Sequence, residues 1–270
     1  MKAFRYIFIL LSVLLFSCED VIVLDLNDGD PRLVIEGYVT DQPGPYTVKI
    51  SKTAKFYDDN IFPPQSGASV VITDDQGNED ILTEVSTGVY QTSTLQGERG
   101  VTYTLSVDYE GQNYTAISKM PEQQILLDSI TSEYEENSFF NDEGYYVRAH
   151  FNDPAGVANY YRFNVLVNGE VYVFDFDGEE QEDDFFYLWS DKFSDGNLND
   201  YDFPHTLEVG DSVYIEMYNL ERSTYDYYRT VADVINGGGV APSNPLSNFG
   251  DTALGYFGAF SITSNYVIVD

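Results

Sequence analysis

Oxygen-bearing side chains gather in one short segment whose spacing is that of a cation-binding loop. Asp195, Asn197 and Asn199 occupy alternate positions, like the first three ligands of an EF-hand loop. The pattern then departs from that loop, since Asp200 replaces the usual glycine and Thr206 replaces the bidentate glutamate. The candidate calcium ligands are therefore Asp195, Asn197, Asn199 and Asp200. The alternative interpretation is a polar turn between two strands.

The single cysteine, Cys18, offers a different chemistry. It follows an apolar run, Tyr6–Phe16, that is preceded by Lys2 and Arg5, which is the pattern of a secretory signal peptide. The run is too short to cross a bilayer, which needs about 20 apolar residues. The four residues that end at Cys18, LFSC, resemble a lipobox. We predict that residues 1–17 are removed and that the thiol is lipidated, the alternative being a buried or incidental thiol.

Two acidic residues, Glu19 and Asp20, follow this cysteine directly, and the apolar segment VIVLDL follows them. A basic site on export machinery could recognise such a pair through charge-assisted hydrogen bonds. The pair resembles the signal that sends Bacteroidota lipoproteins to the cell surface. We therefore expect the cell-surface side of the outer membrane rather than the periplasm. The alternative is that acidic residues are simply frequent in this chain.

Motifs for catalysis are missing from the rest of the sequence. His150 and His205 are isolated, and with one cysteine they form no zinc-binding pattern. The sequence has no G-x-S-x-G elbow, P-loop or H-E-x-x-H motif. Some pair among 45 acidic residues must lie at the separation that glycosidases use, but this reflects abundance only. We expect a non-enzymatic protein; the alternative is a surface enzyme that acts on glycans or peptides through carboxylates.

The charge balance restricts the partners. The chain has 13 Lys and Arg against 45 Asp and Glu, and removal of residues 1–17 takes away two bases and no acids. The mature chain thus keeps 11 basic residues against 45 acidic ones, a net charge of −34. Such a charge repels nucleic acid and anionic membrane surfaces. It suits a cation, a basic partner or simply solubility.

The first part of the mature chain has the pattern of a β-sandwich. After an acidic tether, residues 18–31, apolar residues alternate in short segments separated by turn sequences such as DQPG and DDQGN. The predicted strands are residues 32–40, 45–53, 68–73, 81–85, 88–92, 101–109 and 112–118. They predict one Ig- or transthyretin-like sandwich domain over residues 32–121.

The second part, residues 122–270, is predicted to be a β-rich domain with one short helix. Its predicted strands are residues 125–134, 145–151, 160–167, 171–176, 185–190 and 212–219. The last segment, LGYFGAFSITSNYVIV, is interpreted as a terminal pair of strands. The fold class is therefore mainly β, in two β-rich units.

The predicted helix covers residues 224–236. Ser223 is placed as its N-cap, and Gly237 is placed as its C-terminal stop. Tyr225 and Tyr228 share one face with Ala232 and Ile235 at helical spacing. We interpret this tyrosine face as core packing.

The order of several sequence blocks resembles one known family over nearly the whole mature chain. The blocks are PRLVIEGYVTDQPGPYTVKISKTAKF, GASVVITDDQGNEDILTEVSTGVYQT, GVTYTLSVDYEGQNYTA, YNLERSTYDYYRTV and the segment from NPLSN to ALGYFGAFS. They are similar to a Bacteroidota outer-membrane lipoprotein family catalogued as a domain of unknown function. Its members are commonly encoded beside TonB-dependent receptors.

This resemblance implies an accessory or substrate-binding lipoprotein of such a receptor, without catalytic residues. The first unit separately resembles transthyretin-like and carboxypeptidase-regulatory-like sandwiches, which are usually structural or binding modules. A further alternative is therefore a cell-surface adhesion or structural module, because the fold alone does not decide function.

Overall fold

The computed structural model describes residues 30–54, 62–136, 143–171, 187–235 and 244–270. Cys18, Glu19, Asp20 and Gly237 lie outside these ranges. Among the described residues, no helix has the length and apolar character that a membrane span requires.

The β-class predicted for the first unit is confirmed, and its strands form two packed layers. A four-stranded sheet in the order β4-β3-β7-β8 shares one core with strands β1, β2 and β6 of a larger sheet. Alternation produces this core: in β7, Tyr103, Leu105 and Val107 are buried. Its strands are β1 (Leu33–Thr40), β2 (Thr47–Lys52), β3 (Ser69–Asp74), β4 (Glu79–Ile81), β5 (Thr83–Ser86), β6 (Val89–Gln91), β7 (Thr102–Tyr109) and β8 (Gln112–Lys119).

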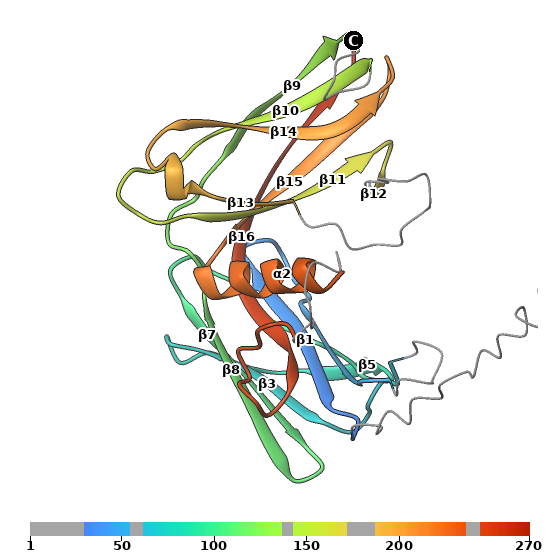
Figure 1. The fold of residues 1–270 in the computed structure, drawn as a ribbon. Coiled ribbons are helices and arrows are strands. Elements are labelled where there is room, and N and C mark those ends of the chain that lie inside the picture. Colours follow the sequence, from blue (N-terminus) through green and yellow to red (C-terminus); the bar gives the residue numbers. More distant parts are fainter. Residues whose placement is uncertain (1–29, 55–61, 137–142, 172–186, 236–243) are drawn as a thin grey trace, which may run out of the picture.

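The second unit builds a separate core from two further layers (Figure 1). A three-stranded sheet, β14-β10-β9, faces strands β13, β11, β15 and β16 of the larger sheet. Aromatic rings fill the space between them; the rings of Phe163 and Phe203 are 5.7 Å apart. The strands are β9 (Leu127–Glu135), β10 (Gly144–Asn152), β11 (Tyr160–Val167), β12 (Glu170–Val171), β13 (Tyr187–Ser190), β14 (Leu198–Leu207) and β15 (Ser212–Leu220), with a 3-10 turn, η1 (Asp191–Phe193), after β13.

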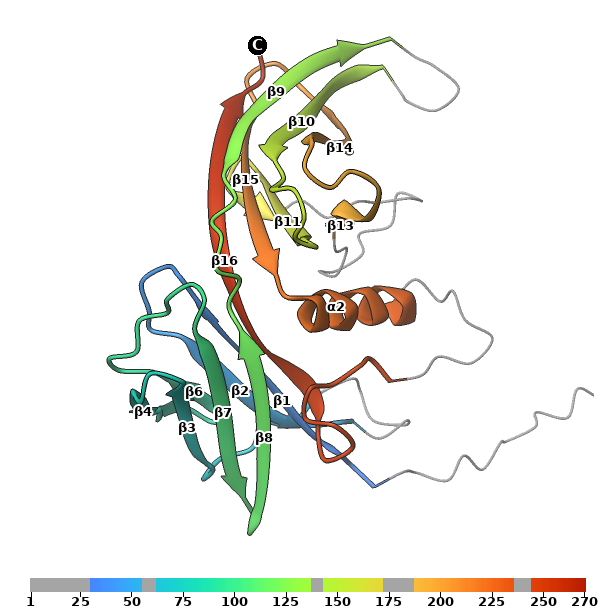
Figure 2. The same cartoon turned by 90° about the vertical axis from the view of Figure 1, so that its left-hand side faces the viewer.

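The C-terminal segment is one long strand, β16 (Leu254–Ile268), and the predicted terminal strand pair is wrong. Residues 254–260 pair in parallel with β1, and residues 261–268 pair antiparallel with β15. Figure 2 shows β16 as a single curved strand that runs along both units. Phe257 and Ala259 of this strand belong to the first core. The segment 122–270 therefore completes the sandwich that residues 32–121 begin.

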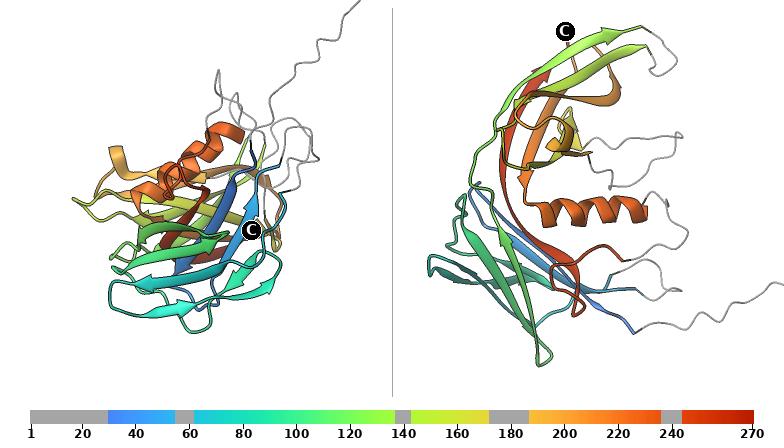
Figure 3. Two further views of the ribbon diagram at one scale, coloured as in Figure 1. Left: turned by 90° about the horizontal axis from the view of Figure 1, so that it is seen from below. Right: turned by 60° about the vertical axis from the view of Figure 1, so that its left-hand side comes forward.

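The only α-helix among the described residues, α2 (Arg222–Ile235), lies on the concave side of this curved sheet (Figures 2 and 3). It begins before Ser223, because the Tyr225 amide donates to the Glu221 carbonyl, so the predicted N-cap is wrong. The predicted core packing of its tyrosines is also wrong. Thr224 is the buried residue of the helix, and Tyr225 and Tyr228 are half-buried at the surface of the sheet.

Candidate functional site

An aromatic hollow of about 470 Å³ lies between α2 and the sheet face of β1, β2 and β16. Five aromatic side chains line it: Tyr38, Tyr227, Tyr228, Tyr256 and Phe260. Threonine hydroxyls and the charged side chains of Glu36 and Lys49 complete the lining. A concave site with apolar walls and a few polar groups is the usual form of a small-ligand site.

The strands position these rings through simple alternation. Tyr256, Gly258 and Phe260 follow one another on the same face of β16, and Tyr38 of β1 is paired with Gly258. A Cβ on Gly258 would lie 3.4 Å from the Phe260 ring and from the Thr224 methyl group. Because position 258 is glycine, a space remains open between the larger side chains of Tyr256 and Phe260.

The rings form two packed pairs. Tyr227 of α2 stacks on Tyr256 with centroids 4.8 Å apart, and Tyr38 packs on Phe260 at 5.5 Å. Tyr38 nevertheless remains 48% exposed. Burial raises the pKa of the Tyr256 hydroxyl to about 12, so this hydroxyl stays protonated near neutral pH. The hollow thus offers ring surface together with hydroxyl donors.

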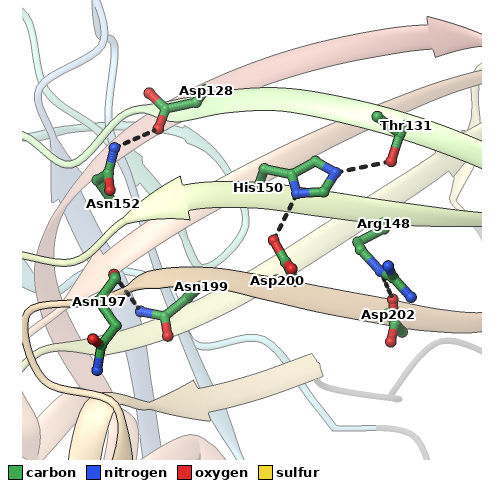
Figure 4. Close-up of polar contacts among 9 residues, drawn as sticks. All are labelled: Asp128, Thr131, Arg148, His150, Asn152, Asn197, Asn199, Asp200 and Asp202. Carbon is green, nitrogen blue, oxygen red and sulfur yellow. Dashed lines mark hydrogen bonds and ion pairs between the residues drawn. The ribbon is translucent and has the colours of Figure 1, made fainter.

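A second constellation lies on the outer face of the three-stranded sheet (Figure 4). His150 Nδ1 is 2.6 Å from Asp200 Oδ1, and His150 Nε2 is 2.8 Å from Thr131 Oγ1. Beside it, Arg148 forms a salt bridge with Asp202. A hydroxyl, an imidazole and a carboxylate in this order have the connectivity of a catalytic triad. Here they come from three adjacent strands and are partly exposed, so we interpret them as a cross-strand polar ladder.

We expect Thr131→Ala to confirm this structural role. The substitution should change the free energy of unfolding by less than about 1 kcal/mol, the usual size of an exposed cross-strand interaction. Hydrolysis of p-nitrophenyl acetate should stay at the buffer rate with both proteins. Ester hydrolysis above that rate which disappears in Thr131→Ala and in His150→Ala would instead show a working triad.

The predicted calcium ligands do not converge. The segment after Asn197 is strand β14 rather than a loop, so the neighbours Asn199 and Asp200 point to opposite faces. Asn199 is buried, where its amide donates to the Asn197 carbonyl, whereas Asp200 bonds to His150 on the outer face. The side chain of His205 lies outside the described residues.

Asp195 instead lies with two aspartates that sequence reasoning did not select. Carboxylate oxygens of Asp153, Asp191 and Asp195 all lie within 4.8 Å of one another. Each carboxylate accepts hydrogen bonds from within the chain. Asp153 accepts from the Tyr161 hydroxyl and the Gly196 backbone amide. Asp191 accepts from the Asn159 backbone amide, and Asp195 accepts from the Gly156 backbone amide. The cluster therefore joins the loop after β10 to the turn before β14.

Burial raises the pKa of the Asp191 carboxyl, and the charges of Asp153 and Asp195 raise it further. The ionised carboxylate therefore costs stability as the pH rises through its folded pKa, and the cost is absent below the unfolded value of about 3.9. We expect Asp191→Asn to unfold less readily at neutral pH, by on the order of 1 kcal/mol, and to lose this advantage near pH 4. Thermal melts in EDTA across this range would measure it.

Asp195→Asn, at the exposed corner of the cluster, is the matched control and should have a smaller effect. If the wild-type protein were more stable than Asp191→Asn at neutral pH in EDTA, the expected cost of burying the Asp191 carboxylate would be contradicted. The same melts with CaCl₂ test the calcium prediction. A calcium-dependent rise in Tm that Asp195→Asn loses would support that prediction.

The family described as "Domain of unknown function (DUF4249)" matches residues 19–265. The chain belongs to this family. The match extends over both units and nearly all of β16, so the strand that joins the two cores lies within the DUF4249 domain. No curated protein matches the sequence at a significant level.

Sequence reasoning missed four of the five ring-bearing residues of the hollow in this DUF4249 chain, and it interpreted the fifth, Tyr228, as core packing. Tyr256 and Phe260 lie in a segment that is apolar on both faces, which gives no indication of which face binds. Tyr227 is outside the tyrosine face that helical spacing picked out. The position of Gly258 between aromatic residues was the available indication.

Proposed function

We propose that the protein is a non-enzymatic lipoprotein, anchored in the outer membrane through Cys18, that captures a ligand for a TonB-dependent receptor. The observation that carries this proposal is the aromatic hollow beside α2. The resemblance to receptor-associated Bacteroidota lipoproteins supports the choice of partner. The family match begins at Glu19, the residue after the predicted lipidation site, which supports the position of the anchor.

The hollow is well suited to capture because its framework is rigid. Its floor belongs to the nine-stranded sheet, in which residues 254–260 of β16 pair with β1 and residues 261–268 pair with β15. The buried Thr224 seats the first turn of α2 close to Tyr256. Ligand sites that are largely formed in advance lose less entropy on binding.

A pull-down from solubilised outer membranes tests the partnership. We expect the tagged wild-type lipoprotein to recover a TonB-dependent receptor. The Cys18→Ser variant should not reach the membrane and should recover no receptor. Thr131→Ala, on the distant sheet face, serves as the matched variant that should still recover the receptor. Recovery of no outer-membrane transporter by the wild-type protein would contradict the proposal.

Protease treatment of intact cells tests the proposed surface location. The wild-type protein should be digested, because Glu19 and Asp20 lie directly after the lipidated cysteine. Alanine at both positions should shift the protein towards protection while lipidation continues. Replacement of Asp28 and Asp30, farther along the tether, is the charge-matched control. Protection of the wild-type protein until lysis would place it on the periplasmic side.

A further inference from the structure

We infer that the aromatic hollow takes a ligand that combines a flat ring with an anionic group. The ring would lie against Tyr38 and Tyr227, and the anionic group would lie at Lys49. This inference rests on the proposed capture function and adds the chemical class of the captured ligand.

The accessible ring surface comes from Tyr38 and from the half-buried Tyr227 and Tyr228, because Tyr256 and Phe260 are themselves buried. Tyr38 is 48% exposed although it contacts Phe260. The gathering of five aromatic side chains in one lining is informative, whereas a single exposed ring would not be. Flat rings pack on aromatic side chains in offset or edge-on arrangements, which contribute about 0.5–1.5 kcal/mol beyond the buried area. A ligand with a ring therefore covers surface that water now contacts.

The charged residues that line the hollow indicate the second part of the ligand, its anionic group. Glu36 and Lys49 are directly opposite each other on β1 and β2, and both line the hollow. Glu36 is engaged in an interaction within the chain. Within the described part of the chain, no ion pair joins Lys49 to a carboxylate. An anionic group of a ligand can thus pair with the Lys49 ammonium without displacing an internal partner.

A second cation lies behind the wall of the hollow. The Arg162 guanidinium is 4.7 Å from the centre of the Tyr228 ring and 5.3 Å from that of Tyr218. Glu36 lines the same hollow and Glu216 accepts a hydrogen bond from Tyr218, so both cations and carboxylates lie close to the hollow. Because charges are screened over about 8 Å at physiological ionic strength, a single anionic group at Lys49 responds mainly to the charges in and beside the hollow. A polyanion would reach beyond them and be repelled.

Two probes of the same shape test the inference on the full mature chain: 2-naphthoate, which is anionic, and its neutral amide, 2-naphthamide. At low salt we expect naphthoate to bind about three-fold more tightly, the size of one exposed ion pair. Lys49→Gln should remove this preference and leave naphthamide binding unchanged. Lys119→Gln, which changes an exposed lysine outside the hollow, should keep the preference. Ligand-detected NMR titrations measure both affinities.

Two further variants separate this inference from the proposed function. Gly258→Val fills the hollow, and Tyr227→Ala removes ring surface from the half-buried side of α2 where the fold is less at risk. Both should weaken both probes. Equal binding of the two probes by the wild-type protein would overturn the ligand class but leave the hollow as a ring-binding site. Absence of binding, or binding that survives both variants, would overturn the hollow as a capture site as well.

Discussion

Cys18→Ser is expected to release the protein from the membrane fraction or to leave it as an unprocessed precursor. The thiol is the one group in the chain that can accept the diacylglyceryl modification, because Cys18 is the only cysteine. Each buried CH₂ of an acyl chain contributes about 0.8 kcal/mol to membrane binding, so losing several chains removes the anchor. Fractionation followed by mass spectrometry of the N-terminal peptide measures both location and processing.

Ser17→Ala is the matched control, since it keeps a small residue before the cleavage site and should leave processing and membrane retention unchanged. Normal retention of Cys18→Ser with a mature N-terminus would remove the basis for a lipid anchor. It would also leave the proposed partnership with an outer-membrane receptor without its means of attachment.

Gly255→Ala is expected to be the most destabilising single substitution proposed for the fold. Gly255 has φ +85°, and a Cβ at this position would lie 2.2 Å from the Ile35 carbonyl oxygen of β1. No side-chain rotation relieves a contact with backbone, so the parallel pairing of β1 with β16 must open. We expect a loss of more than about 3 kcal/mol in the free energy of unfolding, measured by denaturant titration.

Gly250→Ala is the matched control for this effect. Gly250 also has a positive φ, of +63°, but a Cβ there meets no atom within 4 Å. The Gly250→Ala variant should therefore lose only about 1–2 kcal/mol in the free energy of unfolding, which is the cost of positive φ for a residue with a Cβ. Similar losses for the two substitutions would show that β16 is not pressed against β1 as the structure has it.

Local patterns in the sequence determined most strands of the sandwich, but the predicted strand 81–85 is instead two strands, β4 and β5, in different sheets. Alternation placed Tyr103 and Leu105 inside β7. The predicted strands 101–109 and 112–118 form a hairpin, and positive φ at Glu110 and Gly111 is the backbone shape that its two-residue turn requires. These features depend on neighbours within a few residues, so the order of residues alone specifies them.

The tertiary structure decided the features that depend on partners far away in the chain. Alternation shows that a strand has an inner face but does not say which strand lies beside it, so β16 could not be recognised as the strand shared by both cores. For the same reason β14 was not predicted as a strand. Its outer face is polar, which is typical of a loop, and its partner β10 lies some 50 residues earlier.

The candidate site also depends on contacts between segments that are far apart in the chain. Tyr38 and Phe260 meet because β1 pairs in parallel with β16, and Tyr227 joins them because α2 begins where β15 ends. Likewise, Asp195 approaches Asp153 and Asp191 only when two loops fold together. The sequence by itself predicted a lipid anchor, and it determined the charge and the β-class of this protein. Only the tertiary structure decided which rings and charges face one another, because those contacts join segments that no local pattern connects.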